Sequence, residues 1–266
     1  MKRRYEGRII GIIPARMASS RFPGKPLARI CGMPMIGHVY LRSKMSRALD
    51  DVYMATCDTE IADYTASIGG KAIMTSDKHQ RASDRIAEAA VSIERLTGGK
   101  IDIVVMIQGD EPMLRPEMIE EAVAPLCGDK SVIVTNLMAE MDTEEEFDDP
   151  NEIKVVVDKA GDALYFSREP IPSRKKASSK VPMLKQVCVI PFRRDFLTEY
   201  TKMPPTPLEE IESIDMLRIL ENGRKVRMVP TKFRTYSVDT PEDLRAVEDS
   251  MRNDALLKKY CTADKI

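Results

Sequence analysis

The sequence predicts an α/β fold with a mostly parallel sheet and helices on both of its faces. Short apolar, β-rich runs alternate with amphipathic helical patterns through the first half of the chain. Such alternation is typical of strands that are joined by crossover helices and therefore run parallel. The run at residues 103–107 is apolar throughout, as expected for a central strand that is covered on both faces. A chain of 266 residues is also long enough to bury a substantial core around such a sheet.

The elements of the first half follow one another without a long linker. Strands are expected at residues 9–13, 52–56, 71–74, 103–107 and 132–137. Helices are expected between them, at residues 35–48, 59–68, 82–95 and 116–126. No linker along the chain is long or polar enough to mark a domain boundary, so a single domain spanning residues 1–266 is the simpler prediction.

The second half is expected to be richer in β-structure. The predicted elements are a hairpin at residues 154–158 and 163–166, strands at 184–192 and 225–229, and helices at 207–222 and 241–254. Asp239 or Thr240 is expected to cap the last helix. A basic serine-rich stretch at residues 173–181 is predicted to be a loop, and an acidic run at residues 140–149 a solvated turn.

The composition argues against several classes of function. Charged residues make up 31% of the chain and nearly balance at a net charge of -1, so no positive excess favours nucleic acid or an anionic membrane as the main partner. Neither a signal peptide nor a membrane span is recognisable. The five cysteines are scattered and odd in number, which predicts reduced thiols in a cytoplasmic protein. With only two histidines and no paired cysteines, any metal is expected to be a hard ion held by carboxylates rather than zinc.

The most informative stretch is residues 9–27, in which an apolar strand opens into a basic, proline-rich loop. The loop carries Arg16, Arg21 and Lys25, with Gly24 beside the lysine. A strand that ends in backbone N–H groups and fixed positive charges is a common way to hold a polyphosphate. The spacing is neither that of a Walker A loop nor that of a dinucleotide fingerprint. The alternative is a basic surface loop after an edge strand.

Two carboxylates are placed where a magnesium ion could be held. Asp110 follows the apolar run at residues 103–107, and a carboxylate at the end of a central strand faces the crevice where ligands bind in open α/β sheets. Asp239 follows a β-like stretch and precedes the last helix, so the two carboxylates could share one divalent ion. The alternatives are that Asp110 caps the helix starting near Pro116 and that Asp239 caps the helix that follows it.

Five motifs occur in one order along most of the chain. They are Pro14-Ala15-Arg16, Ser20-Arg21-Phe22-Pro23-Gly24-Lys25-Pro26-Leu27, Gln108-Gly109-Asp110-Glu111-Pro112, Tyr165-Phe166-Ser167-Arg168 with Ile171-Pro172, and Val238-Asp239-Thr240-Pro241-Glu242-Asp243-Leu244. This set closely resembles the cytidylyltransferases that activate acidic sugars, specifically the 3-deoxy-manno-octulosonate (Kdo) cytidylyltransferase family. The resemblance spans residues 9–251.

The resemblance implies a reaction in which CTP and a sugar acid give a CMP-sugar and pyrophosphate, for use in surface glycans such as lipopolysaccharide. It implies a Rossmann-like fold, Mg²⁺ as cofactor and a homodimer built on the β-rich segment of the second half. The residues that it implies for nucleotide binding are Ala15, Arg16, Arg21, Lys25 and Arg85. Those implied for catalysis are Arg16, Lys25 and Asp110, those for the metal Asp110 and Asp239, and those for the acidic sugar Gln108 and Arg168.

The sequence departs from the family at positions that are expected to contact the sugar. The family strand His-x-Gly-Ile-Tyr-x-Tyr is replaced at residues 186–192, Leu-Glu-Gln-Leu-Arg loses its glutamine at 214–218, and His-x-Ser-Gly-Thr-Asp/Glu-Arg gains Arg81 at 79–85. Losing a group that bonds a substrate hydroxyl can change discrimination by orders of magnitude. One hypothesis is therefore an acceptor other than Kdo, such as a smaller or less hydroxylated acid; the other is a Kdo enzyme whose pocket is rebuilt from neighbouring residues.

Two other functions remain open at this point. A glycosyltransferase that uses a sugar nucleotide would also place a metal carboxylate after a central strand, but its donor has no γ-phosphate for the basic loop to grip. A non-catalytic homologue would bind CTP without turnover. Neither histidine is expected to be catalytic: His38 is interpreted as a packed helix residue and His79 as a loop residue near the nucleotide.

Overall fold

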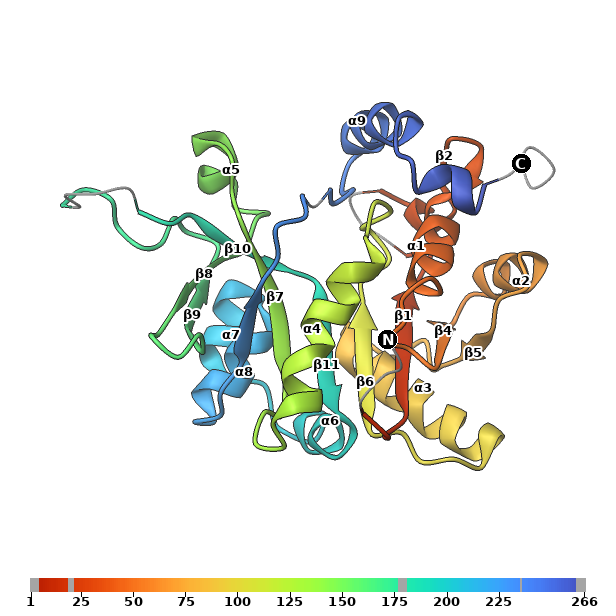
Figure 1. Cartoon of the computed structure of the whole chain (residues 1–266), viewed down its shortest axis with the longest axis horizontal. Helices are drawn as coiled ribbons and strands as arrows, with labels where there is room; N and C mark the ends of the chain where they lie inside the picture. The colour runs from red at the N-terminus through yellow and green to blue at the C-terminus, as the bar shows by residue number, and fades with distance from the viewer. Residues whose placement is uncertain (1–4, 19–21, 177–180, 235, 262–266) are drawn as a thin grey trace. The chain divides into compact units, whose positions relative to one another are not determined.

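The computed structural model describes residues 5–18, 22–176, 181–234 and 236–261 (Figure 1). The chain forms two compact units. Met1–Glu120 and Thr235–Ile266 make the first unit, and Glu121–Arg234, inserted between them, makes the second. The single domain expected for residues 1–266 stays a prediction, because compactness alone does not say whether either unit folds by itself.

Four parallel strands form the sheet of the first unit. They are β1 (Ile9–Ala15), β4 (Asp51–Thr56), β5 (Ala72–Met74) and β6 (Ile103–Ile107), and they pair in the order β6-β1-β4-β5. The order reverses at β1, because the chain moves outward through β4 and β5 and then returns to add β6 on the other side. Ligands of open α/β sheets bind at such a reversal, outside the carboxyl ends of the strands. The predicted parallel, Rossmann-like arrangement is confirmed.

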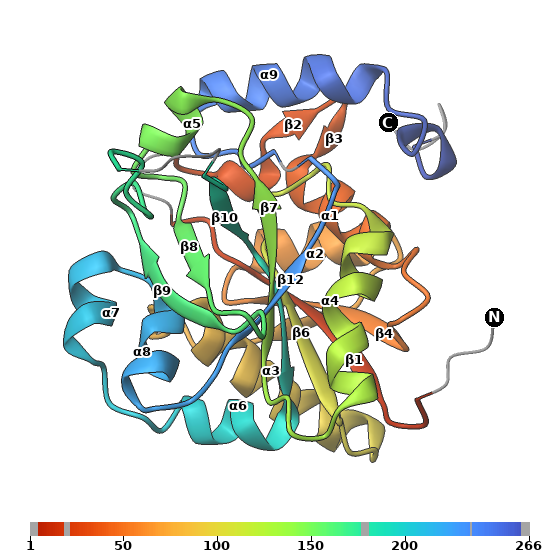
Figure 2. The same cartoon turned by 60° about the vertical axis from the view of Figure 1, so that its left-hand side comes forward.

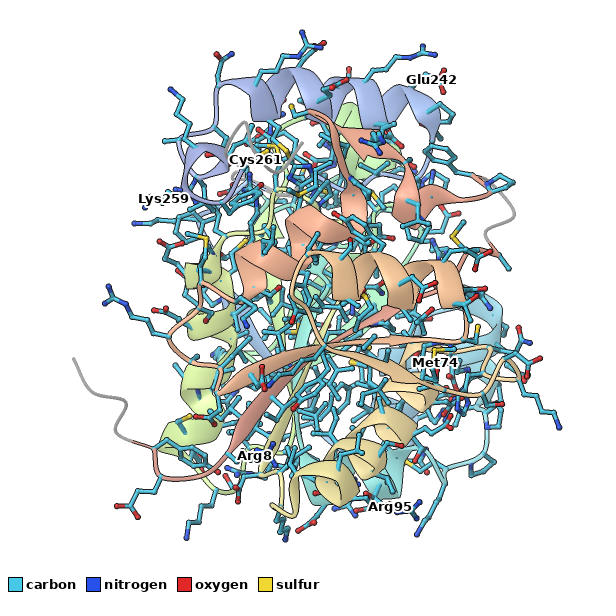
Figure 3. All side chains as sticks on the ribbon, turned by 90° about the vertical axis from the view of Figure 1, so that its right-hand side faces the viewer. Arg8, Met74, Arg95, Glu242, Lys259 and Cys261 are labelled. Carbon is cyan, nitrogen blue, oxygen red and sulfur yellow. The ribbon has the colours of Figure 1, made fainter. Side chains whose placement is uncertain are left out.

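Helices cover both faces of this sheet, and Figure 3 shows them above and below the strands, with Met74 at the β5 edge. The helices on its faces include α1 (Met35–Ser43), α2 (Thr59–Ser67) and α3 (Ala82–Thr97). Helix α9 (Pro241–Arg252) contacts β2 instead, and α4 (Pro116–Gly128) spans the division between the units. Short pieces complete the unit: β2 (Arg29–Ile30), β3 (Met33–Pro34), and the 3₁₀ turns η1 (Lys25–Leu27) and η2 (Leu257–Lys259). All of β6 and nearly all of β1 are buried.

The second unit contains a mixed sheet. Its strands are β7 (Thr135–Glu140), β8 (Lys154–Val157), β9 (Ala163–Ser167), β10 (Leu184–Val187) and β12 (Arg227–Pro230), in the order β12-β7-β10-β8-β9. Only β12 and β7 pair in parallel. The remaining elements are β11 (Val189–Arg193), α5 (Glu144–Asp148), α6 (Arg194–Tyr200), α7 (Pro207–Glu212) and α8 (Asp215–Glu221). Figure 2 shows α7 and α8 beside β9, at the end of this sheet.

The second unit is where the predicted elements differ most from the structure. The strand expected at residues 184–192 is interrupted at Cys188, and the helix expected at 207–222 ends at Glu212 because Ser213 adopts a left-handed conformation with φ 54°. The acidic run expected to be a turn contains α5, which Thr143 caps by accepting a hydrogen bond from the N–H of Glu146 at 3.1 Å. The hairpin expected at residues 154–166 is confirmed as β8 and β9.

Two expectations about the whole chain can be examined within the described residues. There, no helix combines the length and the apolar character needed to cross a membrane. All five cysteines are free thiols, as the sequence predicts.

Candidate active site

A pocket of about 350 Å³ lies in the first unit, where the carboxyl ends of β1 and β6 meet. Its wall includes Ala15 and Arg16 after β1, Gln108 and Asp110 after β6, and Asp239 ahead of α9. Small-molecule sites commonly occupy about 300–1,000 Å³, so the space suits part of a nucleotide. The pocket therefore lies at the reversal of the sheet, where this fold class binds its ligands.

Three segments that are far apart in sequence converge on the ammonium group of Lys25. Its Nζ donates to Oδ2 of Asp110 at 3.0 Å, to Oδ1 of Asp239 at 3.2 Å and to the carbonyl of Val238 at 2.8 Å. The N–H of Val238 in turn donates to the carbonyl of Asp110 at 2.9 Å. The side chains of Lys25, Asp110 and Asp239 are 15%, 29% and 26% exposed, so all three remain accessible from the pocket.

Local structure explains why the lysine points at these carboxylates. The loop after β1 is held by its backbone: the N–H of Met17 donates to Oδ2 of Asp58 at 2.8 Å, and the N–H of Gly24 donates to the carbonyl of Met17 at 3.2 Å. Gly24 has φ 75°, a left-handed conformation that favours glycine, and Pro26 then fits the first turn of η1. The proline-bracketed loop thus holds Lys25 in one place.

The alternative that made Asp239 a helix cap is set aside by the described contacts. Thr240 rather than Asp239 caps α9, accepting the N–H of Asp243 in a capping box. The carboxylate of Asp239 instead accepts from Lys25. Asp110 also contacts Lys25, and its carbonyl accepts from Val238, so it connects the loop after β6 to the segment before α9.

The close approach of β1 and β6 depends on Gly109, which sequence reasoning did not single out. A Cβ at this position would meet Cδ1 of Ile36 at 2.7 Å and the carbonyl oxygen of Pro14 at 3.3 Å. A side chain here would force Ile36 to shift and would press on the carbonyl of Pro14, so glycine suits the close approach of the two strand ends. A glycine directly after an apolar strand and before an acidic residue is the signal that could have identified it.

The donor set fits a hard divalent ion. Two carboxylate oxygens already face one positive charge, the ammonium of Lys25, which shows that the two aspartates can serve a single cation. Magnesium is commonly bound through one or two carboxylates, with water and substrate phosphates as the other ligands. Within residues 5–18, 22–176, 181–234 and 236–261 there is no group of three or more acidic, histidine or cysteine side chains that could enclose a metal. Any ion held here would therefore depend on the nucleotide for further ligands.

The predicted nucleotide-binding residues are distributed around the same pocket. Ala15 is buried and Arg16 is exposed at its rim. Arg85 is 3% exposed; its Nη1 donates to Oγ1 of Thr75 at 2.6 Å, whereas its Nη2 is buried without a hydrogen-bond acceptor among the described residues. A buried guanidinium nitrogen that lacks an acceptor is suited to a polar ligand atom. Arg21 lies outside the described residues.

The loop before α3 adds residues that the motifs alone did not assign. Arg81 and His79 both line the pocket. Nε2 of His79 contacts Oε2 of Glu88, which also accepts the N–H of Ser76 at 3.0 Å, and these hydrogen bonds help to hold the pKa of Glu88 below its usual range against the opposing effect of burial. The histidine is therefore held by a carboxylate, in agreement with its interpretation as a loop residue.

Comparison with known proteins decides the family. Residues 10–226 match the family described as cytidylyltransferase. The chain belongs to the cytidylyltransferase family. The nucleotidyltransferase class predicted from the sequence is thereby confirmed, in preference to a glycosyltransferase.

Named relatives in the cytidylyltransferase family support the finer resemblance. The chain is 43% identical to the 3-deoxy-manno-octulosonate cytidylyltransferases of Geobacter metallireducens and Geobacter sulfurreducens, over 92% of this chain and 98% and 99% of theirs. It is similar to the solved structure of a CMP:2-keto-3-deoxy-manno-octonic acid synthetase in complex with CTP. That similarity has a TM-score of 0.83 and 37% identity, and it covers 92% of this chain and 98% of the other.

Arg168, the cytidylyltransferase residue expected to meet the sugar acid, belongs to the second unit. Its guanidinium donates to three carbonyls: Nε to that of Glu212 at 2.6 Å, Nη1 to that of Pro150 at 2.8 Å and Nη2 to that of Ser213 at 3.3 Å. An arginine has five N–H groups. One N–H on each terminal nitrogen therefore has no acceptor among the described residues. The structure brings together the described nucleotide and metal residues in the first unit, while the contacts given for Arg168 lie within the second.

Residues in the segments that depart from the family pattern, including the retained Arg218, make definite contacts in the second unit. Gln186, where the family has histidine, donates from Nε2 to Oδ1 of the buried Asn136 at 2.5 Å. Nδ2 of Asn136 donates to the carbonyl of Val187 at 2.7 Å. Arg218 forms a two-point ion pair with Glu209, with both N–O distances at 2.7 Å. These side chains serve the packing of the second unit.

Proposed function

We propose that this cytidylyltransferase converts CTP and an acidic sugar, Kdo or a related acid, into a CMP-sugar and pyrophosphate with Mg²⁺ as its cofactor. The observation that carries the proposal is the convergence of Asp110 and Asp239 on Lys25 at the mouth of the β1–β6 pocket. It provides carboxylates for a metal and a cation for phosphate at one point. The product would supply a pathway for surface glycans.

The reaction needs positioning and charge neutralisation more than covalent help. The oxygen of the anomeric hydroxyl attacks the α-phosphorus, the bond from that phosphorus to the bridging oxygen breaks to release pyrophosphate, and the hydroxyl proton passes to solvent water. Arg16, Lys25 and Arg85 supply positive charge around the pocket, and the family resemblance adds Arg21. At an effective dielectric constant of ~20, a close pair of unit charges is worth roughly 4 kcal/mol before desolvation is subtracted.

Asp110 and Asp239 would hold the magnesium ion. Bound there, the ion would neutralise charge on the phosphate oxygens as it develops. The ammonium of Lys25 now occupies the space between the two carboxylates, so in the loaded enzyme it would turn to the triphosphate. The prolines and Gly24 around it keep that movement within the side chain.

The acidic sugar would be held by Arg168, with Gln108 at the pocket. Two guanidinium N–H groups of Arg168 remain for a ligand among the described contacts, one on each terminal nitrogen. Two such donors match the two oxygens of a carboxylate. The three carbonyls that hold the guanidinium are neutral, so its positive charge is available to an acid.

The acceptor is tested by measuring pyrophosphate release from CTP with Kdo and a panel of sugar acids that differ in length and hydroxylation. Turnover of Kdo well above all other acids supports a rebuilt Kdo pocket and ends the hypothesis of a different acceptor. Faster turnover of another acid supports that hypothesis. Binding of CTP without pyrophosphate release with any acid overturns the proposed function.

We further propose a homodimer built through the β-rich second unit. Strand β9 is the terminal strand of its described sheet, and it carries Leu164, which is 61% exposed. An exposed apolar side chain on such a strand is one that another chain can cover. Sedimentation should show a dimer that Leu164→Lys weakens, whereas Leu96→Lys, at a 74% exposed leucine of the first unit, should leave it intact. A monomer at all concentrations would contradict the proposal.

A cytoplasmic location is also proposed. The enzyme would consume CTP, which is a cytoplasmic metabolite, and its five cysteines are free thiols. Locating the tagged full chain by cell fractionation tests this.

A further inference from the structure

The carboxylate of Glu212 accepts hydrogen bonds from three residues at and just after the end of β9. Its Oε1 accepts the hydroxyls of Ser167 at 2.9 Å and Tyr165 at 3.3 Å, and its Oε2 accepts the backbone N–H of Arg168 at 2.8 Å. One side chain thus fixes the backbone from which Arg168 projects. Neither the motifs nor the family resemblance assigned a role to Glu212.

The same residue also holds the guanidinium, through its backbone. The carbonyls of Glu212 and Ser213 accept Nε and Nη2 of Arg168 at 2.6 and 3.3 Å. These carbonyls are accessible because α7 ends at Glu212 and Ser213 takes the left-handed conformation. In an uninterrupted helix the carbonyl of Ser213 would accept the N–H of Leu217, which here donates to Ile214 at 3.1 Å. The break between α7 and α8 therefore creates the acceptors that orient Arg168.

Lys154 holds the same region from the other side. It is fully buried, and its Nζ donates to the carbonyl of Arg168 at 2.7 Å and to those of Asp149 and Glu152 at 2.6 and 2.8 Å. The backbone of Arg168 is thus fixed at its N–H by Glu212 and at its carbonyl by Lys154. A guanidinium with so many restraints loses little freedom when it binds a ligand, which is what a preorganised binding group requires.

We infer that Glu212 is a positioning residue that aims Arg168 at the carboxylate of the acceptor acid. The inference rests on the proposed function, in which Arg168 binds that carboxylate. Glu212 acts through Arg168 and touches no substrate itself. Its loss should weaken binding of the acid and leave binding of CTP unchanged.

The chemistry of the contacts separates three variants. Glu212→Ala removes the acceptor for all three donors. Glu212→Gln can keep contacts to Arg168 and Ser167. Its amide oxygen can accept the N–H of Arg168, and its NH₂ can donate to the hydroxyl oxygen of Ser167, whose own hydrogen can rotate away. Glu212→Asp is shorter by one methylene and cannot reach every donor at once.

The test measures the KM values for acid and for CTP by pyrophosphate release, with Kdo or the acid that the panel shows to be turned over fastest. Glu212→Ala should raise the KM of the acid about tenfold and leave the KM of CTP within twofold of the wild-type value. In Glu212→Gln the KM of the acid should return to within threefold of the wild-type value. Glu210→Ala, at an exposed neighbour on the same helix, should change neither KM. If Glu212→Ala does not fold, Glu212→Asp should still raise the KM of the acid about threefold.

A double variant distinguishes positioning from general destabilisation. If Glu212 acts through Arg168, then Glu212→Ala should add little to the effect of Arg168→Ala on the KM of the acid. A parallel rise in both KM values, or a full additional effect in the double variant, overturns the inference. So does a wild-type KM for the acid in Glu212→Ala when Arg168→Ala raises it. An unchanged KM in Arg168→Ala itself contradicts the proposed role of Arg168, which is a different result.

Discussion

The two units place their functional side chains in different ways. In the first unit, Lys25, Asp110 and Asp239 follow or precede regular elements, and the reversal of a parallel sheet brings their loops to one pocket. In the second unit, Arg168 is oriented by a break between two helices and by a glutamate at that break. A site at the ends of strands can thus be inferred from the order of sequence motifs. A site that depends on an irregular backbone cannot be inferred in this way.

The units also use charge differently. In the first-unit pocket, Lys25, Asp110 and Asp239 are partly exposed and available to a ligand. In the second unit, the buried Arg218 pairs with the buried Glu209, and Lys185 contacts Glu146 and Glu152. Burial raises the pKa of Glu152, whereas the pKa of Lys185, which burial alone would lower, is raised by the two glutamates. There, charge mainly holds the architecture together.

The largest effect is expected at the metal carboxylates. Asp110→Ala should reduce turnover at least a thousandfold, which is about 4 kcal/mol, because it removes a metal ligand. The melting temperature should change little, since the side chain lies in a loop at the pocket. Steady-state kinetics, a direct Mg²⁺ titration and calorimetry test this, with Asp77→Ala at an exposed aspartate as the control. Wild-type rates in Asp110→Ala would refute the assignment.

The corresponding prediction for the second unit concerns stability. Arg218→Met leaves Glu209 charged, 2% exposed and without its two-point partner, and breaking a buried pair in this way costs about 3–5 kcal/mol. Denaturant unfolding should show a loss in this range. The double variant Arg218→Met with Glu209→Leu should recover most of it, because no buried charge then remains. A loss below about 1 kcal/mol in the single variant would mean that the pair is not buried as described.

A smaller effect is expected at Lys25. Lys25→Met should lower kcat/KM for CTP about a hundredfold, or about 2.7 kcal/mol, by weakening the positioning of the triphosphate. Lys44→Met, at an exposed lysine of the same unit, should leave kinetics unchanged. Equal kinetics in wild type and Lys25→Met would end the proposed contact and would remove the contrast between a functional and an architectural use of charge.

The sequence was sufficient to predict the strands and pocket residues of the first unit, because apolar runs followed by polar loops recur along it. Strands β1, β4 and β6 were predicted from apolar runs, and the pocket residues follow them directly. The sequence could not show that Asp110 and Asp239 meet, because that contact depends on how distant loops pack. The pairing of Asp110 with Asp239 was predicted only through the family resemblance, which rests on the order of the five motifs.

In the second unit, the periodicity of apolar residues did not predict where helices and strands end. Residues 207–222 have a helical pattern throughout, yet Ser213 breaks the helix; no glycine or proline at that point signals the left-handed turn. Likewise Cys188 divides an apolar stretch that reads as one strand. The first of these breaks creates the acceptors for Arg168. The residues that act through such contacts, Glu212 above all, therefore left no pattern to find.

The smallest predicted effect concerns a buried titratable group of the first unit that lies outside the pocket. His38 is fully buried; its Nε2–H donates to the carbonyl of Ile30 at 2.8 Å, and its Nδ1 accepts the hydroxyl of Tyr260 at 2.9 Å. Burial, with a smaller contribution from nearby Arg42, lowers the pKa of His38 to about 4.

An unfolded histidine has a pKa of about 6.5, so between pH 6.5 and pH 4 the unfolded state binds more protons than the folded state. The free energy of unfolding therefore decreases as the pH is lowered through that window. His38 should contribute a loss of about 2 kcal/mol in the free energy of unfolding between pH 7 and pH 5. His38→Gln keeps an amide donor and an acceptor but does not titrate, so denaturant unfolding at the two pH values should show a correspondingly smaller loss for this variant. Equal losses in wild type and His38→Gln would mean that burial does not lower the pKa of this histidine as described.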